Sequence, residues 1–140
     1  MSIRANSQLV LEVFSAIEQR DDKKFRDLLH RDFEIHWPPS LPYGRGDGGT
    51  WSETWEPLQP TATERKLDPR IIAASEDEIV VLWRQRGVSR SGDRFDGEVL
   101  GLYRVRDGKL ARAQMFYFDT VAVASFLMKA SEQAHRHSVT

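Results

Sequence analysis

Apolar residues recur with the spacing of an α-helix near the start of the chain, at Leu9, Val10, Val13, Phe14 and Ile17. This pattern predicts a first helix over residues 7–20, with Asn6 or Ser7 as its N-cap. Asp21 and Asp22 then cap a shorter helix with its own apolar face, formed by Phe25, Leu28 and Leu29. Because neither helix can bury its apolar stripe alone, we expect the two to pack together or against a sheet.

A short strand and a long loop come next. The segment FEIHW, residues 33–37, reads as a strand, and residues 38–49, PPSLPYGRGDGG, contain three prolines and four glycines. So many chain breakers predict a loop rather than a continued strand. Thr50 and Glu53 have the spacing of a capping box, so a short helix is expected to begin there.

The following part of the chain is predicted to be mostly β-structure. Residues 65–75 indicate an edge strand interrupted by Pro69, because proline cannot donate to a strand ladder. Three longer apolar segments follow, EIVVLWRQRGVS, RFDGEVLGLYRVR and KLARAQMFYF. Ser91-Gly92 predicts a turn after the first of them, and Asp107-Gly108 is the strongest two-residue hairpin signal in the sequence. Gly97 and Gly101 within the second segment mark a bulge or a close approach of another group.

Asp119 lies between the last strand and a closing helix predicted over residues 121–129. Its carboxylate could serve as a catalytic acid or as the cap of that helix. We interpret it as a cap, because an aspartate before a helix accepts hydrogen bonds from free backbone N–H groups. The polar tail from about residue 130 to residue 140 is expected to be frayed. No linker or repeat divides the chain, so we expect one domain over residues 1–140.

Helices followed by hairpin-linked strands indicate an α+β fold. We expect a cone-shaped, curved sheet, mixed or antiparallel, wrapped around the N-terminal helices. Such a cone leaves an open mouth that suits a ligand.

The composition narrows the classes of function. Twenty basic residues against 21 acidic ones give a formal net charge of −1, which offers no attraction for nucleic acid or an anionic membrane. The absence of cysteine excludes disulfides and thiolate chemistry. No apolar run reaches the length of a membrane span, and no secretion signal is recognisable. A cytoplasmic location is therefore expected, with no cofactor and no metal.

The sequence resembles the nuclear-transport-factor-2-like superfamily, and in particular its SnoaL-like, ketosteroid isomerase-like branch. The motifs that carry the resemblance are DFEIHWPP leading into YGR, and YRVRDGKLARAQMFYFDT. The resemblance covers nearly the whole chain in the order of its elements, and it implies a cystatin-like α+β cone. It also implies a homodimer formed through the outer face of the sheet. Members include isomerases, cyclases, epoxide hydrolases and proteins that only bind.

Two of the family's mechanisms lack their acids here. The acids that epoxide hydrolases use correspond to Leu82 and Met115, with Arg84 between them. The protonated acid of the ketosteroid isomerases corresponds to Gly101, which has no side chain to donate a proton. Both mechanisms are therefore disfavoured.

The same resemblance places Glu34 and His36 at the catalytic end of the first strand. His36 is the candidate base, because an imidazole can accept a proton near neutral pH. Glu34 on the same face could orient it. The alternation of a strand supports another interpretation, in which Phe33, Ile35 and Trp37 face the core and the two polar residues face outward.

The remaining candidates would form the wall of a ligand pocket. The resemblance implies that Tyr43, Trp55, Val99, Tyr103, Met115 and Tyr117 line it. Arg84 could hold a carboxylate or enolate oxygen there. Alternatively, Arg84 lies on a solvated face and pairs with Asp96 or Glu98.

Two functions stay open at this stage. One is an isomerase or cyclase that abstracts a proton next to a carbonyl, with His36 as the base and Arg84 or Tyr117 stabilising the negative charge. The other is a module that binds a small apolar molecule, or dimerises, without catalysis. Both share a small-molecule ligand and a homodimer.

Overall fold

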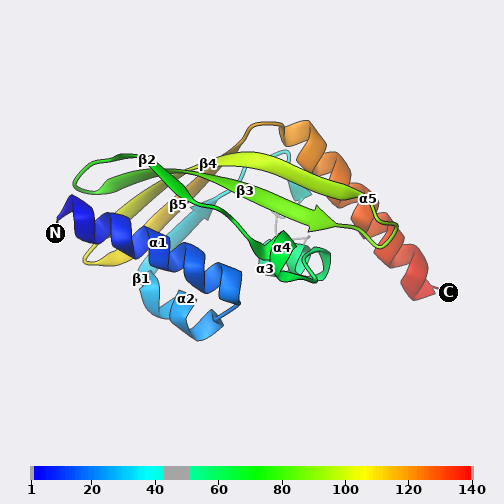
Figure 1. Ribbon diagram of the computed structural model, residues 1–140, viewed down its shortest axis with the longest axis horizontal. Coiled ribbons are helices and arrows are strands. Elements are labelled where there is room, and N and C mark those ends of the chain that lie inside the picture. The colour runs from blue at the N-terminus through cyan, green and yellow to red at the C-terminus, as the bar shows by residue number, and fades with distance from the viewer. Residues whose placement is uncertain (1, 43–50, 140) are drawn as a thin grey trace.

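Five strands form a single curved, unclosed sheet in the computed structural model, which describes residues 2–42 and 51–139 (Figure 1). The order across the sheet is β1-β5-β4-β3-β2. The bounds of the strands are β1 Leu29–His36, β2 Arg70–Ala74, β3 Glu78–Val88, β4 Arg94–Arg106 and β5 Lys109–Tyr117. The α+β fold with N-terminal helices beside a curved sheet is therefore confirmed.

The helices lie at both ends of the chain and in the segment before β2. Their bounds are α1 Ile3–Gln19, α2 Asp22–Leu28, α3 Trp51–Trp55, the 3-10 turn η2 Glu56–Leu58, α4 Ala62–Arg65 and α5 Thr120–Val139. No helix within the described part of the chain is both long and apolar enough to span a membrane.

The first helix begins earlier than its apolar pattern predicted. Ser2 is the N-cap, and its side-chain oxygen accepts from the Ala5 backbone N–H at 3.0 Å. Asn6 lies inside the helix instead, 2 % exposed, and its side-chain amide donates to the Glu76 carbonyl. Asp21 caps α2 as expected, accepting from the Lys24 backbone N–H at 3.1 Å.

The hairpins follow the predicted turns. Asp107 and Gly108 both have positive φ, 54° and 72°, which is the backbone of the two-residue turn that this dipeptide favours. Strand β2 lies at the edge of the sheet, as predicted, but it begins only after Pro69, since Arg65 ends α4 and no strand precedes the proline. Strand β1 pairs with β5 in parallel, and the other strand pairs are antiparallel, so the sheet is mixed.

The two faces of the sheet have different environments. Along β3 every second residue is buried, from Ile79 to Gly87, and these residues face the helices. Arg84 and Arg86 point to the other face, where Arg84 Nε lies 2.8 Å from Asp96 Oδ1. The sheet thus has an inner apolar face and an outer face that carries ion pairs.

A capping box is present before β2 at a position that the pattern analysis missed. The Thr50 half of the predicted box lies outside the described residues. In α4 the Glu64 carboxylate accepts from the Thr61 backbone N–H at 3.0 Å and also from the Thr61 hydroxyl. The hydrogen bond from the Thr61 side chain is the main cause of a lowered pKa at Glu64.

The closing helix confirms the interpretation of Asp119 and corrects that of the tail. The Asp119 carboxylate accepts from the Ala122 backbone N–H at 3.0 Å, as a cap does. Helix α5 continues to Val139 and does not end near residue 129. Its Phe126 ring stacks on Trp55 and Phe95, with centroid distances of 5.9 and 5.6 Å.

Candidate functional site

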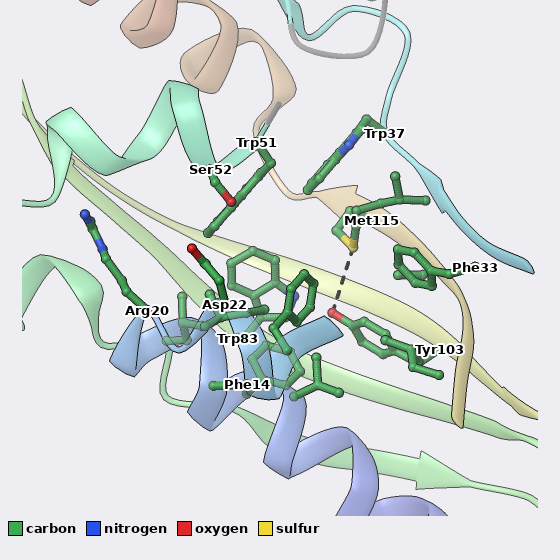
Figure 2. Close-up of a pocket in the computed structure, with 18 of the residues that line it drawn as sticks. Phe14, Arg20, Asp22, Phe33, Trp37, Trp51, Ser52, Trp83, Tyr103 and Met115 are labelled. Carbon is green, nitrogen blue, oxygen red and sulfur yellow. Dashed lines mark hydrogen bonds between the residues drawn. The ribbon is translucent and has the colours of Figure 1, made fainter. Parts of the chain in front are cut away.

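A cavity of about 460 Å³ lies between the N-terminal helices, α3 and the inner face of the sheet (Figure 2). Helix α1 contributes its apolar face, β1 contributes alternate residues near its end, and β3, β4 and β5 contribute the inner wall. The apolar lining includes Val13, Phe14, Ile17, Phe25, Phe33, Ile35, Trp37, Trp51, Leu67, Trp83, Tyr103, Leu110 and Met115. A cavity with this size and lining suits a small, flat, mainly apolar molecule.

Aromatic rings fix the shape of the cavity. Phe14 meets Trp83 and Tyr103 edge-on, with centroid distances of 5.8 and 5.7 Å. Trp37 and Trp51 have nearly parallel ring planes, 2° apart, with centroids separated by 6.4 Å. Because aromatic pairs in these geometries attract each other, the walls are held in place before any ligand enters.

Tyr103 places a hydroxyl group in the apolar inner wall. The residue is 5 % exposed, and within the described part of the chain its O–H donates only to the Met115 sulfur, at 3.8 Å. Burial raises the pKa of Tyr103 well above its ordinary range, and the neighbouring Trp83 side chain lowers it by less. The phenol is therefore neutral near pH 7, and it is a buried hydrogen-bond donor.

One indole N–H group of the lining is also buried without an acceptor. Trp51 Nε1 donates to no acceptor among the described residues, whereas the Trp83 side chain interacts with the Tyr103 phenol oxygen. A buried donor without a partner costs free energy unless a bound group satisfies it. The wall therefore favours a ligand that carries hydrogen-bond acceptors.

Gly101 makes room for the Tyr103 ring. A Cβ atom at residue 101 would collide with the hydroxyl and ring atoms of Tyr103. Gly101 is opposite Met115 in the strand register, so the phenol lies over the glycine and reaches the methionine sulfur. The close approach predicted for this glycine is thus made by the tyrosine two residues further along the strand.

The opening of the cavity is polar. Arg20 and Asp22 come from the junction of α1 and α2, Ser52 comes from α3, and Glu56 follows α3 in the 3-10 turn η2. The Arg20 guanidinium donates to the carbonyl oxygens of Glu56 and Gln59, at 3.2 and 3.1 Å. Sequence reasoning missed Asp22 as a site residue, because its position at the start of a helix is sufficiently explained by capping.

The candidate base is found outside the cavity lining. His36 and Glu34 have side chains 44 % and 67 % exposed, and His36 Nε2 lies 3.7 Å from Glu34 Oε2. The alternate residues Phe33, Ile35 and Trp37 line the cavity instead. The interpretation in which Phe33, Ile35 and Trp37 face inward is therefore the correct one for this strand. The structure does not bring His36 or Glu34 to the cavity wall.

The other predicted ligand residues divide into three groups. Tyr103 and Met115 line the cavity. Trp55, Val99 and Tyr117 are buried but are not part of its lining. Arg84 is on the outer face with Asp96, and Tyr43 lies outside the described residues.

The described side chains offer no metal site, since no group of three or more histidines and carboxylates lies close enough to hold an ion. What the cavity provides is an apolar volume, donor groups on its wall and carboxylates at its opening.

The SnoaL-like domain model matches residues 10–113 of the chain. No curated protein matches the sequence. A nuclear-transport-factor-2-like protein from Burkholderia pseudomallei is 27 % identical, with a TM-score of 0.65, over 87 % of this chain and 95 % of that one.

Two further solved structures share the fold at lower identity. TerC, crystallised with polyporic acid, is 23 % identical, with a TM-score of 0.66, over 89 % of this chain and 98 % of its own. A protein from Jannaschia assigned as a SnoaL-like polyketide cyclase is 19 % identical, with a TM-score of 0.66, over 93 % of this chain and 94 % of its own.

Proposed function

Since the chain belongs to the SnoaL-like domain family, we propose that its cavity binds a small, largely apolar organic molecule. The observation that carries the proposal is the buried Tyr103 hydroxyl, a neutral donor on the wall of an aromatic cavity of about 460 Å³. A ligand with a carbonyl or similar oxygen would accept from it, while the rings of the ligand contact Phe14 and Trp83. TerC, which shares the fold and was crystallised with polyporic acid, supports a small organic molecule as the occupant of the cavity.

A second candidate function is isomerisation or cyclisation by proton abstraction next to a carbonyl. The observation in its favour is the approach of His36 to Glu34, 3.7 Å between Nε2 and Oε2, which suits a base and its orienting carboxylate. The likeness to a protein assigned as a polyketide cyclase also favours it. Binding remains the better supported function, because the imidazole is outside the cavity lining.

Titration with flavone, a flat ketone, tests the proposed function. Three tryptophans line the cavity, so binding should quench the protein's fluorescence. We expect Tyr103→Phe to weaken flavone binding by about fivefold to tenfold, the effect of one neutral hydrogen bond. The matched control is Tyr117→Phe, the same change at a buried tyrosine outside the lining.

His36→Ala distinguishes the two candidate functions. A binding module should keep its affinity for flavone in this variant, whereas an enzyme that uses His36 should lose turnover by orders of magnitude while it remains folded. Mass spectrometry of small molecules released from the purified protein would supply the substrate for that assay. Quenching that is absent, or equal in wild type and Tyr103→Phe, would count against the proposed binding mode.

We also propose a homodimer that forms through the outer face of the sheet, in the cytoplasm. Leu82, Leu100 and Phe116 are neighbours in the strand register on that face, and Leu100 and Phe116 are 40 % and 50 % exposed. A row of exposed apolar side chains on a sheet is typical of an interface. Light scattering should give twice the chain mass of 16.1 kDa, and Phe116→Lys should give the monomer.

A further inference from the structure

Asp22 presents a carboxylate to the cavity that no other residue uses. The residue lines the cavity, and its side chain makes no hydrogen bond or ion pair within the described structure. The cap of α2 is Asp21, so Asp22 is not needed for that role. Figure 2 shows Asp22 pointing toward the side of the opening where Ser52 and Trp51 lie.

The cation that lines the cavity together with this carboxylate, Arg20, is already engaged. Arg20 donates to two backbone carbonyl oxygens, and its nearest carboxylate is that of Glu56, at 4.0 Å. Arg20, Asp22 and Glu56 together carry a formal charge of −1, from one positive and two negative groups. An anionic group placed against Asp22 would meet its negative charge, and a donor group there would meet an acceptor.

The inner wall has the opposite character. On β3 and β4 its polar groups are the Trp83 indole N–H and the Tyr103 hydroxyl, both of them donors, and the Tyr103 O–H meets only the weak acceptor Met115 among the described residues. Figure 2 shows Tyr103 and Asp22 on different sides of the cavity. The apolar surface of Phe14 lies between the two polar ends, beside Trp83 and Tyr103.

We propose that the ligand is bipolar, with an acceptor oxygen at Tyr103 and a hydroxyl or amino group that donates to Asp22. This inference rests on the proposed function of the cavity and specifies its ligand class as a neutral or cationic aromatic ketone with a distal donor. Asp22 is then the residue that selects for the donor, because a carboxylate accepts hydrogen bonds and repels a second anion.

Four probes of similar shape test this assignment by equilibrium dialysis: 2-phenylnaphthalene, flavone, 4′-hydroxyflavone and flavone-4′-carboxylate. Flavone adds an acceptor to the hydrocarbon frame, the hydroxyl derivative adds a distal donor, and the carboxylate derivative adds a distal anion. We expect 4′-hydroxyflavone to bind about threefold to tenfold tighter than flavone, the gain from a hydrogen bond to a partly solvated carboxylate. Flavone-4′-carboxylate should bind more weakly than flavone.

Asp22→Ala should abolish the advantage of the hydroxyl derivative and reduce the penalty of the carboxylate derivative. Asp22→Asn, which keeps the shape and removes the charge, should give intermediate values. The matched control is Asp27→Ala, which removes an aspartate from the same helix at a position outside the cavity lining and should leave all four affinities unchanged.

The outcomes test the role of Asp22 separately from the proposed binding of a small apolar molecule in the cavity. If flavone binds but the hydroxyl derivative gains nothing, or keeps its gain in Asp22→Ala, the assignment of Asp22 is wrong while the binding function stands. If none of the four probes binds, the proposed function fails and the inference fails with it.

Discussion

The phenol oxygen of Tyr103 lies 3.8 Å from the sulfur of Met115, within the wall of the cavity. A thioether sulfur is a weak acceptor, so this contact orients the hydroxyl without satisfying it. A carbonyl oxygen that entered the cavity would be a better partner. In the proposed function, the hydroxyl is therefore oriented for an acceptor oxygen of the ligand.

Tyr103 should make the folded state sensitive to alkaline pH. Burial raises its pKa in the folded protein above the ordinary value of about 10. Its contribution to the free energy of unfolding is therefore complete below about pH 10 and decreases as the pH rises further, by up to about 1.4 kcal/mol per pH unit. Urea unfolding of wild type and Tyr103→Phe from pH 8 to 11 should show a shallower decline in the variant. Parallel curves would contradict the burial of the phenol.

Gly101→Ala should damage both stability and the site. The new Cβ would overlap the Tyr103 phenol, so the ring must move, at a cost of about 1–3 kcal/mol for an overpacked core. Flavone affinity should also fall, because the hydroxyl leaves its position. In a Tyr103→Ala background, Gly101→Ala should lower the free energy of unfolding much less. The reason is that the effects of substitutions at residues in contact do not add. Equal costs in both backgrounds, measured by urea unfolding, would show that the two residues do not share this space.

Gly87→Ala should affect stability alone. A Cβ there would lie 2.9 Å from Trp55 Cζ3 and 3.2 Å from Phe126 Cε1, in the cluster between the sheet and α5. We expect a loss of about 1–3 kcal/mol in the free energy of unfolding. Flavone affinity should remain, because neither ring lines the cavity. If Gly87→Ala lowered flavone affinity without lowering the free energy of unfolding, Gly87 would belong to the binding site instead.

Asp119→Ala should reduce the free energy of unfolding by about 1 kcal/mol, because the first turn of α5 loses its cap. Asp119→Asn should cost less, since asparagine is a good cap. Neither substitution should change flavone affinity. A variant that is as stable as wild type but no longer binds would give Asp119 a role in the site.

Local signals explain why the strands could be predicted from the sequence. Strand β4, Arg94–Arg106, has the bounds of its apolar segment, and the turn that follows it has the backbone that Asp107-Gly108 favours. Alternation also decided which side chains of β1 face inward, Phe33 and Ile35 rather than Glu34. The bounds of β4, the turn after it and the alternation in β1 all depend on residues that are close in the sequence. The residue types at these positions strongly favour one backbone conformation.

The site depends on contacts that no local pattern encodes. Asp22 has the sequence context of a helix cap, and only the packing of α1 and α2 over the sheet brings it to the opening. Tyr103 was expected in the pocket wall through the family resemblance, but its donor role depends on Gly101 two residues earlier. Ser2 rather than Asn6 begins α1, because the Asn6 amide finds a partner across the fold at Glu76.

The parallel pairing of β1 with β5 sets the order in which this protein can mature during synthesis. Ile35 is bonded in register with Ala113, whereas β2, β3 and β4 find partners close by in the chain. The ribosome must therefore deliver the chain as far as β5 before β1 can join the sheet. Until then the cavity is not formed in the nascent chain, and the apolar face of α1 is exposed and can be bound by chaperones.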